Sequence, residues 1–175
     1  MKRVILSAIM ALTFLGANAQ VWMGGSMEFN STKYENVDKA GLTFGIRPEF
    51  GYTLTDKWDV AIGLGVTTKS DYPDVSDYTE FSLAPYARFT FAQMGKVGFF
   101  VDGGVDFGIE KKKHSDDEST FWIGLRPGVK YAASDKITFV AHLGSFGYKT
   151  IADREDWFGF NIDNSALTFG MYWNF

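Results

Sequence analysis

Charged side chains recur through the middle of this chain, and a histidine lies among them. The set comprises four cations, Arg47, Arg88, Arg126 and Lys130, the carboxylates Glu28, Glu49, Asp59, Glu80, Asp102 and Asp106, and the imidazole of His142. Opposite charges can pair in a structural ion network, line a proton or ion path, or act as acid and base. One imidazole is weak evidence for a metal site or a general base. We expect no metal and no cofactor.

One short motif occurs twice. The stretch "GIRPEFGYTLTDKWDVAIGLG" (45–65) returns as "GLRPGVKYAASDKITFVAHLG" (124–144), and "APYARFTFAQMGKVGFFVDGG" (84–104) is a looser third copy. A single active site would not need to be duplicated. The recurrence therefore favours an architectural unit, a strand-turn-strand hairpin, over a catalytic motif.

Apolar residues occupy every second position through most of the chain, which is the period of a β-strand with two different faces. The alternation predicts eight strands, over Val21–Phe29, Leu42–Leu54, Trp58–Val66, Phe81–Phe91, Val97–Ile109, Phe121–Tyr131, Ile137–Leu143 and Leu167–Phe175. Short links at Thr55–Lys57, Ala92–Gly95 and Ala132–Asp135 alternate with longer polar links at Thr32–Lys39, Lys69–Tyr78, Lys111–Ser119 and Lys149–Asn164. This order is typical of an up-and-down antiparallel barrel.

The apolar face must point outward. An eight-stranded barrel has an interior that side chains just fill, and the large apolar set of this chain could not fit there. The other face is rich in small residues, which suit a narrow lumen. The fold class is therefore all-β, an eight-stranded up-and-down antiparallel transmembrane β-barrel, closed by its first and last strands because lipid leaves no backbone group unpaired.

The first nineteen residues have a separate character. Lys2 and Arg3 precede an apolar run, and Ala17-Asn18-Ala19 follows it, which is the order of a secretory signal peptide. We expect a cleaved signal peptide at 1–19 and a barrel domain at 20–175. The net charge of −4 indicates no nucleic-acid partner.

The final stretch "LTFGMYWNF", with the signal peptide and the eight alternating strands, resembles the small outer-membrane barrels of the outer membrane protein A and X type and the outer-membrane β-barrel domain common in Bacteroidetes. The resemblance implies the outer membrane of a Gram-negative bacterium, periplasmic termini, and lipid, lipopolysaccharide and the outer-membrane assembly machinery as partners. It also implies an assembly signal made of Phe169, Met171, Trp173 and Phe175.

Strand parity predicts how the lumen is filled. An ion network is expected from Arg47, Glu49, Arg88, Asp102, Arg126 and His142, with Arg88 almost opposite Asp102 and Arg126 facing or neighbouring His142. Bulky rings on the same face should plug the barrel, namely Trp22, Tyr86, Phe100, Trp122 and Phe146. Inward glycines should make room for these rings and for the arginines. Local bulges are expected at Pro48, Pro85 and Pro127, where a strand lacks a donor.

Three functions remain open from the sequence. The chain could be a non-enzymatic barrel whose four long extracellular loops bind a ligand or whose body supports the envelope, a narrow channel, or a lipid-A-modifying enzyme. The enzyme would need His142 and a serine on one lipid-accessible face, but Ser145 has the opposite parity. In the fourth loop, Trp157, Phe158 and Phe160 are candidate contact residues, or else they extend the barrel rim. The extracellular ligand is not identified by these residues.

Overall fold

The structure is a computed structural model, and it describes residues 20–33, 40–70, 77–112, 117–152, 155–162 and 168–175. The predicted signal peptide at 1–19 lies outside the described residues. Within the described ranges, no helix is long and apolar enough to cross a membrane.

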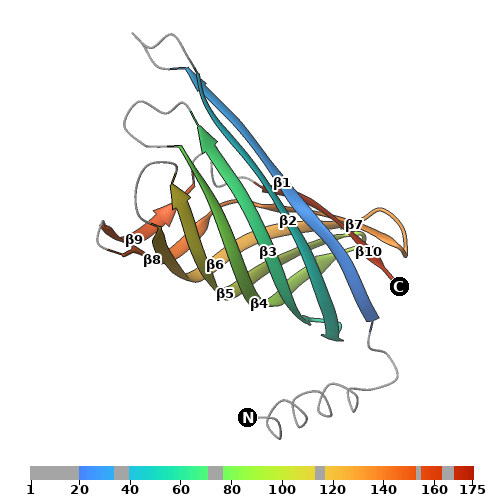
Figure 1. Ribbon diagram of the computed structural model, residues 1–175. Helices are drawn as coiled ribbons and strands as arrows, with labels where there is room; N and C mark the ends of the chain where they lie inside the picture. The colour runs from blue at the N-terminus through green and yellow to red at the C-terminus, as the bar shows by residue number, and fades with distance from the viewer. Residues whose placement is uncertain (1–19, 34–39, 71–76, 113–116, 153–154, 163–167) are drawn as a thin grey trace, which may run out of the picture.

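The wall of the barrel is built from ten strand segments (Figure 1). They are β1 (Gln20–Lys33), β2 (Ala40–Thr55), β3 (Trp58–Ser70), β4 (Tyr78–Met94), β5 (Val97–Lys112), β6 (Glu118–Ala132), β7 (Ile137–His142), β8 (Ser145–Ile151), β9 (Glu155–Asn161) and β10 (Thr168–Asn174). Strand β6 pairs with both β7 and β8, while β10 pairs with β7 and β9 pairs with β8. The ten segments therefore make eight antiparallel passes.

The first and last strands close the barrel. Trp22 of β1 lies opposite Asn174 of β10, and the Phe175 backbone N–H donates a hydrogen bond of 3.0 Å to the carbonyl of Val21. The start of β1 and the end of the chain therefore meet at the short-turn end, as Figure 1 shows. This pairing covers Trp22 to Met27 and removes the open edges over that stretch, whereas β9 pairs only with β8 among the described strands. The predicted eight-stranded antiparallel barrel is confirmed.

The repeated motif forms equivalent hairpins. Thr55 Oγ1 accepts hydrogen bonds from the backbone of Lys57 and Trp58 in the first copy. Ser134 Oγ accepts them from Lys136 and Ile137 in the second. A hydroxyl at the same motif position thus holds both turns. The repeat is architectural.

The seventh pass is broken opposite Pro127. Strand β6 pairs Gly128 with His142, but beyond Pro127 it pairs Leu125 with Phe146, which is one residue out of register. The N–H and C=O of one residue point to the same neighbouring strand. Because Leu143 N–H donates to the Pro127 carbonyl at 2.9 Å, the donor that Pro127 lacks is on this side. The facing strand bulges there.

The bulges expected at the other two prolines are not present. The pairing registers of β2 with its neighbours run unchanged past Pro48, and those of β4 run unchanged past Pro85. Register shifts occur instead between Thr53 and Thr55 and between Thr90 and Ala92, close to the short turns. The prediction was therefore wrong for Pro48 and Pro85.

The break at Leu143–Gly144 reverses the parity of β8 and β9, whereas β10 keeps the predicted one. Gly144 takes a φ of 148°, a conformation that other residues rarely adopt. Beyond it, Phe146 lies in the row of Leu125, on the outer face, rather than in the lumen. The prediction of an inward Phe146 was wrong for this reason.

The fourth polar link is mostly a strand and not a long loop. Residues 155–161 form β9, which pairs with β8 from Ser145↔Asn161 to Ile151↔Glu155. Phe158 and Phe160 lie in one row with Tyr148 and Phe146 on the outer face, whereas Trp157 lies opposite Lys149 on the other face. These residues extend the barrel wall, and the expectation that they sit in a loop is corrected.

The outer face is apolar along the whole wall. Large apolar side chains remain exposed on every strand, including Phe44, Leu64, Phe81, Phe107, Leu125, Phe139 and Met171. Aromatic rings gather near the short turns, among them Trp58, Phe91, Tyr131 and Trp173. Exposed apolar area of this extent requires lipid around it.

Candidate functional site

A buried arginine lies across the lumen near its middle. Arg88 of β4 is opposite Asp102 of β5, and its Nε and one terminal nitrogen donate hydrogen bonds of 2.7 and 2.8 Å to the two carboxylate oxygens. The side chains are only 2% and 4% exposed. A bidentate pair is the strongest geometry for this contact. The predicted opposition of the two residues is confirmed.

Aromatic rings surround the Arg88 guanidinium. Its central carbon lies 3.9 Å from the centre of the Phe100 ring and 5.3 Å from that of Tyr172. Trp22, Phe100, Val140 and Tyr172 form one buried cluster against which Tyr86 packs. Cation–π attraction is strengthened where water is excluded. Together the rings and the ion pair form the closed layer of the lumen.

Glu49 completes the closed layer. Its Oε2 accepts hydrogen bonds from the hydroxyls of Tyr86 at 2.5 Å and of Tyr172 at 2.8 Å. The residue is buried. Tyr172 also contacts Arg88, whose terminal nitrogen donates to its hydroxyl at 3.4 Å. Tyr172 thus joins Glu49 to the Arg88–Asp102 pair in a continuous hydrogen-bonded network, and Tyr86 adds a second hydrogen bond to Glu49.

Glycines make room for these large side chains, as predicted. A side-chain carbon at Gly128 would meet the Phe100 ring, and one at Gly104 would meet Tyr86. At Gly63 it would lie 3.1 Å from the Arg47 side chain. Since such a carbon would force these groups apart, the inward glycines are part of the packing.

Two more exposed arginines lie above the closed layer, that is, on its side away from the short turns. Arg47 of β2 and Arg126 of β6 both donate to Asp106 Oδ2, at 2.8 and 3.4 Å. These arginines are equivalent positions of the repeated motif, and they are 28% and 26% exposed. The Arg126 guanidinium also lies 4.1 Å from the Trp122 ring. His142 lies opposite Gly128 and not opposite Arg126, but Arg126 and His142 line the same cavity, so they are neighbours as predicted.

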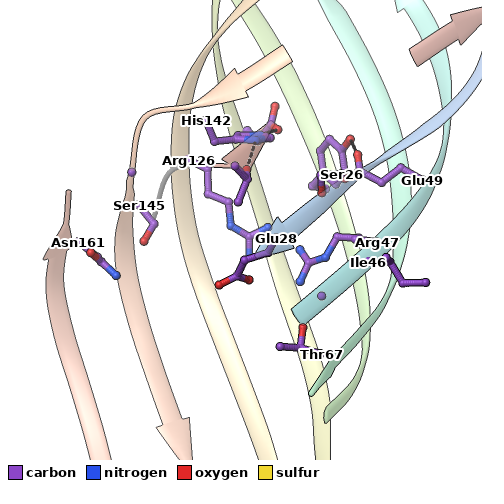
Figure 2. A pocket seen from close by; sticks show the side chains of 15 residues that line it. Ser26, Glu28, Ile46, Arg47, Glu49, Thr67, Arg126, His142, Ser145 and Asn161 are labelled. Carbon is purple, nitrogen blue, oxygen red and sulfur yellow. Dashed lines mark hydrogen bonds and ion pairs between the residues drawn. The ribbon is translucent and has the colours of Figure 1, made fainter. Parts of the chain in front are cut away.

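Cavities lie on both sides of the closed layer. One of about 250 Å³ at the short-turn end is lined by Asp56, Lys130 and Arg88. Another of about 230 Å³ toward the opposite end is lined by Arg47, Arg126 and others, shown in Figure 2. Arg88 borders the first and Asp102 borders the second, so their ion pair separates the two spaces.

His142 joins the network from β7. Its Nε2 lies 2.8 Å from Asp102 Oδ2, and its Nδ1 lies 3.1 Å from Thr168 Oγ1. Ser145 lines the same cavity as His142, because the break at Leu143–Gly144 reverses its parity. The sequence-based argument that separated these two residues was therefore wrong. Among the described residues, no group of His, Asp or Glu is placed to hold a metal ion.

Three contributors to the lumen were missed from the sequence. Tyr172 was overlooked between the outward Met171 and Trp173, although its parity alone places it inside. Asp106 was noted only as one charge among many, and its role depends on the length of two arginine side chains. Thr168 reaches His142 through the pairing of β10 with β7. The expected assembly-signal residues, Phe169, Met171, Trp173 and Phe175, all lie exposed on the outer face or at the chain end.

A closed antiparallel wall with an apolar exterior and a polar, filled interior defines an integral membrane β-barrel. The sequence matches the family described as "Outer membrane protein beta-barrel domain" over residues 4–175, and the chain belongs to that family. The membrane is accordingly the outer membrane of a Gram-negative bacterium. A comparison with curated protein sequences gives no significant match.

Solved structures share the fold at low sequence identity. Neisserial surface protein A is similar at 15% identity with a TM-score of 0.57, covering 90% of this chain and 96% of that one. The N-terminal β-barrel domain of Pseudomonas aeruginosa OprF is similar at 18% identity and a TM-score of 0.54, covering 90% and 98%. Ail of Yersinia pestis in a nanodisc is similar at 14% and 0.51, covering 90% and 100%. These likenesses concern the fold alone.

Proposed function

We propose that this protein is a non-enzymatic outer-membrane barrel whose lumen does not pass solutes, and whose cell-surface end serves binding or envelope support. The observation that carries the proposal is the buried Arg88–Asp102 pair within its ring of aromatic side chains. Opening a path would leave two charges without partners in a region that excludes water, which is costly.

The orientation follows from the two ends of the barrel. Short turns belong to the periplasmic side in such barrels, so both termini and the turns at 56–57, 95–96 and 133–136 should face the periplasm. The opposite end, with the β8–β9 hairpin, should face the outside together with lipopolysaccharide. The exposed C-terminal alternation, from Phe169 to Phe175, should be recognised by the outer-membrane assembly machinery.

Planar-bilayer recording of the purified protein tests closure. We expect no steady unitary currents from the wild-type chain, because eight strands leave an interior that side chains can fill. A large, stable conductance in the wild type would replace the closed-barrel proposal with the channel alternative. Lys130→Gln, which removes a charge outside the closed layer, is the matched control and should also remain silent.

The enzyme alternative rests on Thr168, His142 and Asp102, which have the order of a nucleophile, base and orienting acid. Against it, Asp102 already gives both carboxylate oxygens to Arg88, so its charge is neutralised by a permanent cation. A fluorophosphonate probe distinguishes the two: we expect no covalent label on the folded protein. Labelling that is lost in Thr168→Val would establish a nucleophile.

A further inference from the structure

The two arginines above the closed layer have unused donors. A guanidinium carries five N–H groups. Toward the described residues, Arg47 and Arg126 each donate one hydrogen bond, and both go to the same oxygen of Asp106. Both side chains border the 230 Å³ cavity and are more than a quarter exposed. The cavity is therefore lined by two cationic groups, each with four N–H donors that make no hydrogen bond to the described residues.

A carboxylate borders the same cavity; it interacts electrostatically with Lys69 and Arg47 but makes no hydrogen bond to either arginine. Figure 2 shows Glu28 of β1 projecting into the space that Arg47 and Arg126 enter, and no hydrogen bond or ion pair within the described chain links it to them. The other two carboxylates of the lining are already used. Glu49 accepts two tyrosine hydroxyls, and Asp102 holds Arg88 and His142.

This arrangement decides what kind of solute the cavity suits. A simple anion would meet the arginines but would be repelled by Glu28, and a simple cation would meet Glu28 but would be repelled by two guanidiniums. A molecule carrying both charges close together satisfies both ends. The volume of about 230 Å³ restricts the molecule to a small one. Ser145 and Asn161 add neutral hydrogen-bonding groups on the wall.

We propose that this cavity binds a small zwitterion of the free amino-acid class. Its carboxylate accepts hydrogen bonds from Arg47 and Arg126, and its ammonium donates to Glu28. The closed layer beneath makes the cavity a blind pocket, so the zwitterion binds and leaves from the same end. The proposal concerns the open cavity and holds whether or not the closed layer proves tight to ions.

The test compares a zwitterion with its two charged fragments. Glycine, acetate and methylammonium are titrated at constant ionic strength into ¹⁵N-labelled protein in lipid nanodiscs. The indole N–H of Trp122 and the Nε–H of Arg126 are the reporters, because the Trp122 ring lies against that guanidinium. We expect saturable shifts with glycine and affinities at least about tenfold weaker for each fragment, since acetate loses the contact with Glu28 and methylammonium loses the contacts with both arginines.

Two variants and one control assign the contacts. Glu28→Gln and Arg47→Gln should each weaken glycine binding by about tenfold or more, and Glu28→Gln decides the result if Arg47→Gln fails to fold. Lys130→Gln removes a charge from the other cavity and should leave binding unchanged. Three results would overturn the proposal: no saturable shift with glycine, acetate binding as tightly as glycine, or equal binding by Glu28→Gln and wild type.

Discussion

The lumen holds arginine–carboxylate contacts in two layers, and the layers differ in how completely their groups are used. In the closed layer, one arginine meets one aspartate through two hydrogen bonds, and aromatic rings exclude water from both. In the open layer, Arg47 and Arg126 share a single oxygen of Asp106 and border a cavity. The same residue types thus form a structural brace in one layer and an unsaturated polar surface in the other.

The difference shows that parity alone does not determine the role of a lumen charge. Arg88 and Arg126 flank Asp102 on either side in the sheet, at the same level of the ladder. Arg88 takes the carboxylate, and Arg126 reaches Asp106 instead, with the Trp122 ring against its guanidinium. The free energy of unfolding should therefore depend strongly on Asp102, the partner of Arg88, and weakly on Arg126.

The largest effect is expected from Asp102→Ala. The substitution leaves Arg88 charged among Phe100, Tyr172 and other rings, and removing one partner of a buried pair costs about 3–5 kcal/mol. Urea unfolding in lipid vesicles, followed by the change in gel mobility between folded and unfolded barrel, measures the loss of unfolding free energy.

Asp106→Ala is the matched control in the open layer. It also removes one carboxylate, but both of its arginines are partly exposed and can be solvated, so the loss should be clearly smaller. Equal losses for the two aspartates would show that the open layer is as tightly closed as the other and would end the distinction.

Leu64→Arg tests the outer surface against the lumen. Leu64 is 47% exposed on the apolar face near the middle of β3, so the arginine would enter the hydrocarbon region at a cost of about 2–4 kcal/mol. Thr67→Arg is the comparison, because Thr67 borders the open cavity, where a long polar side chain can reach water. If both variants unfolded at the wild-type urea concentration, the assignment of the two faces would be wrong.

The closed layer was largely readable from the sequence. The alternation of apolar residues fixes which side chains point inward, and counting back from the turn at Gly95 places Arg88 almost opposite Asp102. The uninterrupted count pairs Arg88 with Gly103, next to Asp102, and the register shift between Thr90 and Ala92 brings Asp102 directly opposite. Long, regular strands on both sides of a two-residue turn make such pairings predictable.

The region beyond Pro127 was not readable in the same way. Three prolines lie within strands, and the sequence offers no sign that only the third would displace its neighbour. The consequence is large, since a one-residue slip moves the side chains of the following strand to the other face. Phe146 went outward and Ser145 joined the cavity, so the lining of the open layer could be known only from three-dimensional pairing.

A smaller effect is expected from Phe160→Ala in the β8–β9 hairpin. The Phe160 ring lies 4.4 Å, centre to centre, from Phe146 on the outer face, and such pairs contribute about 0.5–1.5 kcal/mol. Trp157→Ala is the comparison, because Trp157 lies on the opposite face of the same strand and its loss leaves the Phe146–Phe160 packing in place. Reduced binding of intact cells to a surface in Trp157→Ala, with wild-type folding, would support a contact role for this hairpin.

The smallest stability effect is expected from Arg47→Gln, and it bears most directly on the comparison of the two layers. Arg47 donates one hydrogen bond to Asp106, and Arg126 still donates to the same oxygen when Arg47 is replaced by glutamine. A partly exposed ion pair contributes about 0–1 kcal/mol, so the unfolding midpoint in urea should barely move.

Arg88→Gln is the comparison for Arg47→Gln. It leaves the buried Asp102 carboxylate without its arginine and should therefore lower the unfolding midpoint strongly. A large loss in Arg47→Gln would mean that this arginine is a brace like Arg88 and that its free donors are not available to a solute. A negligible loss together with weakened glycine binding would separate the two roles within one barrel, since the same substitution would then change recognition and leave the fold intact.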